Sequence, residues 1–305
     1  EMRAVVYRRY GGPEVLEYTD VPDPKLSQNS VLVRVRAAAI NPADHMLQAG
    51  LAESHTDAWF PVIPGWDVAG VVEQVGAGVS EFAPGDEVIG FIRQEILHHG
   101  AYAELVSAPT ETLARKPRMA SWPEAAGLPL AGLTAYRAIV QTLKVEPGET
   151  VLIHGAAGGV GAVAAQLALA REARVIGVAS AGHHEFLRSI GVHPIAHGDG
   201  IVGRVRALAP DGVDAALDCV GNGVLHATAE VGSSRIRACS IVDGGPGITT
   251  VFARSDAAIL TLLAEMVDAG RLKVPIAATY PLAQAAAAQT ALKQSHPPGK
   301  IVLVV

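Results

Sequence analysis

The feature that most constrains the fold is a cluster of glycines between an apolar run and an alanine-rich segment. The apolar run covers residues 151–153, and it is followed by Gly155, Gly158, Gly159 and Gly161. Small helix-forming residues continue to residue 166, and a second strand-like segment covers residues 174–179. This order predicts a strand, a tight turn, a helix and a second strand. We interpret the turn as a nucleotide-binding site, because its glycines and the helix N-terminus suit a phosphate. The alternative is a buried helix start without a ligand.

The composition narrows the classes of protein that the chain can belong to. It has 305 residues, enough for two domains, and a net charge of −6 without a basic stripe, which argues against a nucleic-acid partner. Its two cysteines, Cys219 and Cys239, are too few for a disulfide framework and fit a reducing compartment. No apolar run reaches the roughly 18 residues of a membrane span, and the N-terminus lacks the apolar core of a signal peptide. We therefore expect a cytoplasmic protein without a membrane segment.

The two parts of the chain differ in their local patterns. Up to about residue 119, Gly and Pro separate short β-rich runs at residues 31–35, 68–75 and 87–91, which is typical of an all-β barrel or sandwich. From Ser121 on, a helix-start signal opens a region in which strands and helices alternate. That alternation predicts a doubly wound parallel sheet. The last residues, 301–305, form a strand without a helix, and we expect this strand to join the sheet of the first part.

A series of motifs in a fixed order makes the chain similar to a known family. They lie at residues 2–7, 11–16, 39–44, 64–72, 84–88, 100–104, 132–136 and 299–303, besides the glycine turn. The chain resembles the medium-chain dehydrogenase/reductase superfamily, and within it the zinc-free quinone oxidoreductase branch that includes zeta-crystallin. The resemblance implies an α/β protein with the active site in the cleft between two domains. These are a GroES-like β-barrel catalytic domain, residues 1–121 and 275–305, and a Rossmann NADP-binding domain, residues 122–274.

The residues at the expected metal positions argue against zinc. Zinc enzymes of the superfamily carry a cysteine in one motif and a His-Glu pair in another, whereas this chain has Asn41, Trp66 and Asp67 there. A catalytic zinc needs three protein ligands, and asparagine and tryptophan do not supply them. The adjacent histidines at 98–99 and 183–184 are expected to point in different directions and to be polar loop residues. We therefore predict a metal-free protein.

The end of the second strand bears on the choice of cofactor. NAD-binding folds usually place an acid about 20 residues past the glycines, and this chain has Ser180 near that point, which favours NADPH. Relatives often add a cation directly after the serine and a tyrosine further on, where this chain has Ala181 and His197. The strength of the preference stays open, with His183, His184, His197 or Arg188 as substitutes for the cation. The alternative role for Ser180 is that of a helix N-cap.

The resemblance also implies which residues bind the cofactor. By position in the family motifs they are Asn41, Thr134, Ala157, Gly158, Gly159, Val160, Gly161, Ser180, His197, Val220, Phe252 and Lys300. For Thr134 the alternative is a polar residue inside a helix that bonds its own backbone.

The residues after the strand that ends near residue 40 are the candidate catalytic groups. Asn41 is expected to orient the nicotinamide or the substrate, and Asp44 to anchor a hydrogen-bond or water network; the alternative for both is turn capping. Many relatives have a tyrosine proton donor where this chain has Met46, which cannot donate a useful proton. The proton donor is therefore left open between His45, another residue and solvent. Trp59 and Trp66 are expected to line an apolar substrate pocket, unless they serve only core packing.

These features lead to one function and two alternatives. We expect an NADPH-dependent reductase that transfers hydride to a small quinone or an α,β-unsaturated carbonyl compound, because such substrates need only hydrogen bonds at the oxygen. The alternatives are a dedicated enoyl or enone reductase of a biosynthetic pathway and a non-catalytic NADPH-binding protein. By family analogy we also expect a homodimer whose sheets pair through the strand near residues 236–242.

Overall fold

The chain divides into two units, one β-rich and one with a parallel sheet. The computed structural model describes residues 1–295 and 297–305. Unit 1 comprises Glu1–Leu130, Ser255–Ala269 and Val274–Val305, and unit 2 comprises Ala131–Arg254 and Gly270–Lys273. Helices α2 (Trp122–Gly127) and α8 (Ala257–Asp268) thus belong to unit 1, whereas the sequence places residues 122–274 together. Within the described residues, the helices are too short or too polar for any of them to cross a bilayer.

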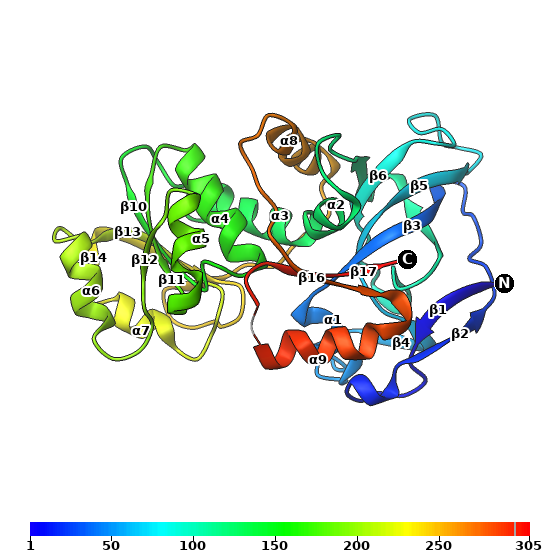
Figure 1. Cartoon of the computed structure of the whole chain (residues 1–305), viewed down its shortest axis with the longest axis horizontal. Helices are drawn as coiled ribbons and strands as arrows, with labels where there is room; N and C mark the ends of the chain where they lie inside the picture. The colour runs from blue at the N-terminus through cyan, green and yellow to red at the C-terminus, as the bar shows by residue number, and fades with distance from the viewer. Residues whose placement is uncertain (296) are drawn as a thin grey trace. The chain divides into compact units, whose positions relative to one another are not determined.

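A seven-stranded sheet forms the centre of unit 1 (Figure 1). Its strands run in the order β16 (Ile276–Pro281), β17 (Lys300–Val304), β3 (Ser30–Ile40), β5 (Asp67–Val75), β6 (Glu87–Phe91) and β9 (Leu113–Arg115), and β8 (Leu105–Pro109) also pairs with β3. The C-terminal strand β17 lies antiparallel to β3, with Ile301 opposite Ile40. The expectation that the last residues join the first sheet is therefore confirmed.

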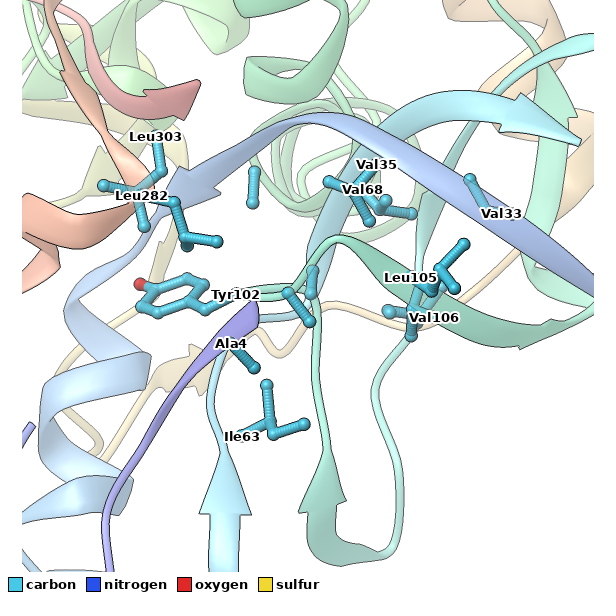
Figure 2. Packing of buried hydrophobic residues seen from close by; sticks show 14 of the residues in the cluster. Ala4, Val33, Val35, Ile63, Val68, Tyr102, Leu105, Val106, Leu282 and Leu303 are labelled. Atoms are coloured by element: carbon cyan, nitrogen blue, oxygen red, sulfur yellow. The ribbon is translucent and has the colours of Figure 1, made fainter. Parts of the chain in front are cut away.

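Smaller elements complete unit 1 and enclose its core. Two further sheets pair β1 (Met2–Val6) with β2 (Glu17–Val21), and β4 (Asp57–Ile63) with β7 (Ile96–His99). The remaining helices are α1 (Pro42–Gln48) and α9 (Ala285–Ser295). Figure 2 shows aliphatic side chains of β3, β5 and β8 packed with Leu282 and Leu303, and the ring of Tyr102 lies in the same cluster with its hydroxyl group at one side. The burial of this ring fixes the position of a polar hydroxyl inside the unit.

Unit 2 contains a six-stranded parallel sheet. The strand order is β12 (His193–Ile195), β11 (Arg174–Val178), β10 (Thr150–His154), β13 (Val213–Asp218), β14 (Gly232–Ser240) and β15 (Ile248–Thr250). The connecting helices are α4 (Gly159–Ala170), α5 (His184–Ser189), α6 (Ile201–Leu208) and α7 (Val224–Thr228), and α3 (Pro129–Tyr136) precedes β10. The chain moves outward from β10 to β12 and then returns to place β13 on the other side of β10. This reversal confirms the doubly wound sheet, and ligands of such sheets bind at the carboxyl ends of the strands beside it.

The structure corrects the expected dimer strand. Strand β14 pairs with β13 on one side, and its residues Ala238–Ser240 pair with Ile248–Thr250 of β15 on the other. The segment near residues 236–242 is therefore not a free edge where β15 covers it, and the outer strand of the described sheet is β15. The segment is apolar because it lies between two strands. An interior strand of this kind has the same sequence pattern as an apolar edge strand.

Candidate active site

The turn after β3 places Asn41 and Asp44 at the start of α1. Asn41 is the N-cap and Pro42 occupies the first helical position. The backbone N–H of Asn41 donates to Oδ2 of Asp44 at 2.9 Å, which is the reciprocal bond of a capping box. The expected capping role of Asp44 is thus confirmed. The capping bond holds Asn41 and Asp44 in fixed positions at the end of β3.

The side chain of Asn41 belongs to a buried polar cluster with Asp67 and Lys300. The Nδ2 atom of Asn41 donates to Oδ2 of Asp67 at 2.9 Å, and Nζ of Lys300 donates to Oδ1 of Asn41. The same Nζ lies 3.9 Å from Oδ2 of Asp67, whose Oδ1 accepts the backbone N–H of Leu130 at 2.8 Å. All three side chains are nearly inaccessible, at 1% for Asn41, 0% for Asp67 and 6% for Lys300. Their positions therefore depend on one another, since each carries a polar group that water does not reach.

Burial shifts the pKa values of both Asp67 and Lys300. It raises the pKa of the Asp67 carboxyl, and the nearby Lys300 ammonium and the bond from Asn41 oppose this. It lowers the pKa of Lys300, and the carboxylates of Asp67 and Asp44 oppose this. Each partner thus favours the charged form of the other, so the removal of one partner leaves a costly buried group.

Asp44 has two carboxylate oxygens in different surroundings. Its Oδ2 accepts the N–H of Asn41 and the hydroxyl of Tyr102, the latter at 2.7 Å. Its Oδ1 is buried and has no hydrogen-bond partner within the described residues. Burial raises the pKa of Asp44 to about 7, although the hydrogen bonds from Tyr102 and Asn41 and the charge of Lys300 oppose this rise, whereas Asp67 adds to it.

Three residues of this neighbourhood were not predicted as site residues. Tyr102 lies in one of the family motifs, but only the structure shows its hydroxyl bonded to Asp44. Gln48 lies one helical turn after Asp44, and its amide exchanges two hydrogen bonds with Gln289 of α9, at 3.2 and 3.0 Å. The spacing of four residues between Asp44 and Gln48 indicates that both side chains lie on the same face of α1. Nothing in the sequence indicates that residues 48 and 289 meet.

A small cavity lies beside Asp44 in unit 1. Its volume is about 20 Å³, and its walls include Tyr7, Asp44, Leu47, Trp66, His98 and His99. Trp66 also packs edge-on against Phe91, with ring centroids 5.8 Å apart. Trp59 is not among the cavity residues and is 59% exposed, although its ring lies 6.1 Å from that of His98. Of the two tryptophans, Trp66 is the one that the structure places beside a candidate catalytic group.

The histidine pair at 98–99 differs from expectation. Both residues lie in strand β7, not in a loop, and their ring centroids are only 3.9 Å apart. The prediction that the two side chains point in different directions is therefore wrong for this pair. In the part of the chain that the structure describes, no group of three or more His, Cys, Asp or Glu side chains is placed to hold a metal ion.

In unit 2, the glycine turn fits a dinucleotide pyrophosphate. Gly155 has a φ of +75° directly after β10, and a Cβ on Gly161 would overlap the carbonyl oxygen of Gly155, so glycine is required at both positions. A Cβ on Gly158 would meet only that oxygen, at 3.4 Å, among the described atoms. The turn therefore stays open at Gly158, just before the first N–H groups of α4, where Ala157, Gly159 and Val160 complete the predicted binding segment.

The other predicted cofactor residues of unit 2 gather at the carboxyl ends of the strands. Ser180 follows β11, His197 follows β12, Val220 follows β13 and Phe252 follows β15. Because the strands are parallel, these ends lie along one edge of the sheet. Ser180 is the N-cap residue of the short helix Ala181–His183, as the alternative expected, but its side chain makes no capping hydrogen bond. Thr134 is buried in α3.

A histidine and an arginine in the loops after β11 and β12 bond to backbone oxygens. Nε2 of His184 lies 2.8 Å from the carbonyl oxygen of Ala179, at the end of β11. The guanidinium of Arg204 donates to the carbonyl oxygens of Ala196 and His197, at 3.0 and 3.2 Å. These contacts fix a histidine and the loop of His197 beside the end of β11, where sequence reasoning expected a cation.

Comparison with known proteins identifies the family. Residues 27–118 match the alcohol dehydrogenase GroES-like domain, and residues 190–303 match the zinc-binding dehydrogenase domain. A chloroplastic NADPH-dependent alkenal/one oxidoreductase of Arabidopsis thaliana is 32% identical, over 99% of this chain and 79% of that protein. The structure of an NAD-dependent alcohol dehydrogenase matches with a TM-score of 0.93 at 31% identity, covering 100% of both chains. A quinone oxidoreductase from Coxiella burnetii matches with a TM-score of 0.88 at 30% identity, covering 100% of this chain and 99% of that chain.

The chain therefore belongs to the medium-chain dehydrogenase/reductase superfamily, in its quinone oxidoreductase branch. It has the GroES-like and Rossmann architecture of that superfamily, and it is an NAD(P)-dependent oxidoreductase that acts as a reductase on a small molecule.

Proposed function

We propose that the chain is an NADPH-dependent, zinc-independent reductase of quinones or α,β-unsaturated carbonyl compounds. The observation that carries this proposal is the engagement of Asp67. In zinc enzymes of the superfamily this position belongs to the metal site, whereas here the carboxylate is bonded to Asn41, to the N–H of Leu130 and to the charge of Lys300. A conjugated substrate suits such a site, because hydrogen bonds suffice to stabilise the charge that develops on its oxygen.

The chain's own residues bind and orient the reactants. Bound nicotinamide supplies the hydride. The glycine turn and the N-terminus of α4 bind the pyrophosphate, together with the residues at the strand ends. Lys300 and Asp67 hold the amide of Asn41 in one orientation, and its second N–H is the group that we assign to the nicotinamide or the substrate oxygen. Asp44 anchors the hydrogen-bond network. We assign Trp66 in the cavity wall and the exposed Trp59 to the substrate as apolar surface.

The substrate class is tested by turnover with matched compounds. We expect NADPH oxidation with quinones and with enones, and none with the corresponding saturated ketones, because a bare carbonyl lacks the polarisation that it needs. Reduction of the saturated ketones at similar rates would contradict the proposed substrate class. An absence of turnover with every compound, despite NADPH binding, would favour the non-catalytic alternative.

The preference for NADPH is the second part of the proposal. Ser180 follows β11 without an acid that would repel the 2′-phosphate, and the NADPH-dependent relative supports the same choice. The change Ser180→Asp should weaken NADPH binding by about tenfold or more, roughly 1.4 kcal/mol, because like charges then face each other. The change should leave NADH binding equal or improved. Fluorescence titration with both cofactors measures this. Equal affinities in the parent protein, or no change in the variant, would refute this description of the pocket.

Oligomeric state and location complete the proposal. We place the protein in the cytoplasm, where its two cysteines stay reduced, in keeping with the free thiols of Cys219 and Cys239. We also retain the homodimer, now without the pairing through β14, since β15 covers that strand. A monomer mass by light scattering at micromolar concentration would remove the dimer from the proposal.

A further inference from the structure

The two carboxylate oxygens of Asp44 differ in their hydrogen bonds. Oδ2 accepts two hydrogen bonds, from the N–H of Asn41 and the hydroxyl of Tyr102. Oδ1 is buried without a partner in residues 1–295 and 297–305. An oxygen that already accepts two donors is a poor place for an acid proton, so a protonated Asp44 carries its proton on Oδ1. A neutral Asp44 therefore holds one O–H group that no described side chain receives.

The cavity beside Asp44 gives that proton a path. Its volume of about 20 Å³ suffices for one water molecule. Asp44 contributes to one part of its wall, and His98 and His99 contribute to another. His99 is exposed and His98 is half-buried, so this part of the cavity wall lies near the surface of unit 1. Trp66, one of the two tryptophans that we assign to the substrate, lines the same cavity.

Burial allows Asp44 to be protonated near neutral pH. The titratable groups that act on it or are acted on by it are Tyr7, Tyr102, Asp67 and Lys300, with His45 adjacent in α1. Burial raises the pKa of Asp44 to about 7, with the bonds from Tyr102 and Asn41 and the charge of Lys300 opposing. The acid and its carboxylate are thus both populated near neutrality, as a proton donor that must be reloaded requires.

The proposed reaction needs a donor that the sequence does not supply at the usual place. Reduction of an enone ends with protonation of carbon, and the tyrosine of many relatives is replaced by Met46 here. We propose that Asp44 is the proton source, passing a proton from Oδ1 through one water in the cavity to the α-carbon of the substrate. This inference rests on the proposed reductase function.

The reduction adds one hydride and one proton to the enone. The hydride that a bound nicotinamide would supply forms the new C–H bond at the β-carbon, and the electron pair of the C=C bond moves toward the oxygen to give an enolate. The α-carbon takes a proton from the water as the water takes one from Asp44. The enone is reduced, the cofactor is oxidised, and Asp44 becomes a carboxylate that solvent reprotonates through the cavity.

Asp44→Asn tests the proposal with little change in shape. The amide oxygen can keep both hydrogen bonds that Oδ2 accepts, and the NH₂ group takes the place of Oδ1 without an acid proton to give. We expect kcat for enones to fall by about 100-fold, as for loss of a general acid. The loss on quinones should be about tenfold smaller than the loss on enones, because a reduced quinone takes its protons from water at oxygen.

Two further readouts separate a proton source from a capping residue. With an α-substituted enone in deuterated water, the parent should deliver deuterium to one face of the α-carbon, and the Asn variant should lose this selectivity. In the parent, kcat for the enone should fall as pH rises through about 7, because the protonated acid is the donor. Tyr102→Phe serves as the matched control: it removes a bond that lowers the pKa of Asp44, so it should keep the selectivity and move this decline to higher pH.

The outcomes are distinct. Equal losses on enones and quinones, or retained facial selectivity and an unchanged pH decline in Asp44→Asn, would show that Asp44 only caps α1 and would overturn the inference. If the Asn variant does not fold, the test is the pH at which kcat for the enone falls in the parent and in Tyr102→Phe. The same pH in both proteins would overturn the inference. A parent that reduces neither enones nor quinones contradicts the proposed function instead.

Discussion

Gly158→Val is expected to weaken NADPH binding by about 100-fold, roughly 3 kcal/mol, because the loss of about two charge-assisted hydrogen bonds to phosphate has that size. The residue has φ −75° and ψ 178°, an extended conformation that valine adopts without strain. Its Cβ would make one ordinary contact, with Gly155, so the fold should tolerate the change. The rest of the side chain would fill the space before the first N–H groups of α4, which the pyrophosphate needs.

A neighbouring variant provides the contrast. Gly161→Ala would press its Cβ into the carbonyl oxygen of Gly155, so it should damage the fold of the turn as well as binding. Circular dichroism should therefore show parent-like unfolding for Gly158→Val and a lower midpoint for Gly161→Ala. NADPH binding to folded Gly158→Val within about threefold of the parent, well under 1 kcal/mol, would mean that the turn does not contact the cofactor.

Lys300→Met is expected to destabilise unit 1 by about 3–5 kcal/mol near neutral pH. Methionine preserves the length of the side chain, but it removes the ammonium that lies 3.9 Å from Asp67 and bonds to Asn41. Asp67 is then left fully buried without an opposite charge. Urea unfolding followed by tryptophan fluorescence measures the effect in unit 1 alone, since Trp59, Trp66 and Trp122 all lie in it.

The pH dependence of this loss has a definite sign. Burial already raises the pKa of Asp67 in the folded state, and removal of Lys300 raises it further, because Lys300 lowers it. An acid whose folded pKa is raised loses stability as pH rises from its unfolded pKa to its folded one. The difference from the parent should therefore be smaller at about pH 5 than at about pH 8.

A double variant is the control for Lys300→Met. Adding Asp67→Asn to Lys300→Met removes the orphaned charge, so the pair should be more stable than Lys300→Met alone and lose the pH dependence. If Lys300→Met alone costs less than about 1 kcal/mol at every pH, the ion pair is not what holds β5 and β17 at this point.

Local patterns were sufficient to predict most of the fold. The apolar run, glycine turn and small-residue helix appear as β10, the turn at Gly155 and α4. The helix-start signal at Ser121 is also confirmed, since its Oγ accepts the N–H of Glu124 at 3.2 Å. The same signal does not say which core the helix joins. Helix α2 lies in unit 1, because it packs against β3, β5 and β17 and not against the parallel sheet.

The candidate site was predictable only where it is local. Asn41 and Asp44 stand at capping distance, so a shared role could be inferred from three residues of spacing. Asn41 and Lys300 are 259 positions apart, and Gln48 and Gln289 are 241 apart. Such contacts depend on strand order and helix packing, which no local pattern encodes. Periodicity likewise could not show that β15 would cover β14.

Turnover by metal-free protein tests the central claim most directly. The protein is treated with a strong chelator, its metal content is measured by elemental analysis, and NADPH oxidation is followed with one enone and its saturated ketone. We expect full activity on the enone, none on the ketone, and far less than one zinc per chain before and after treatment. About one tightly held zinc per chain, with enone reduction lost on chelation and restored by zinc, would contradict the account.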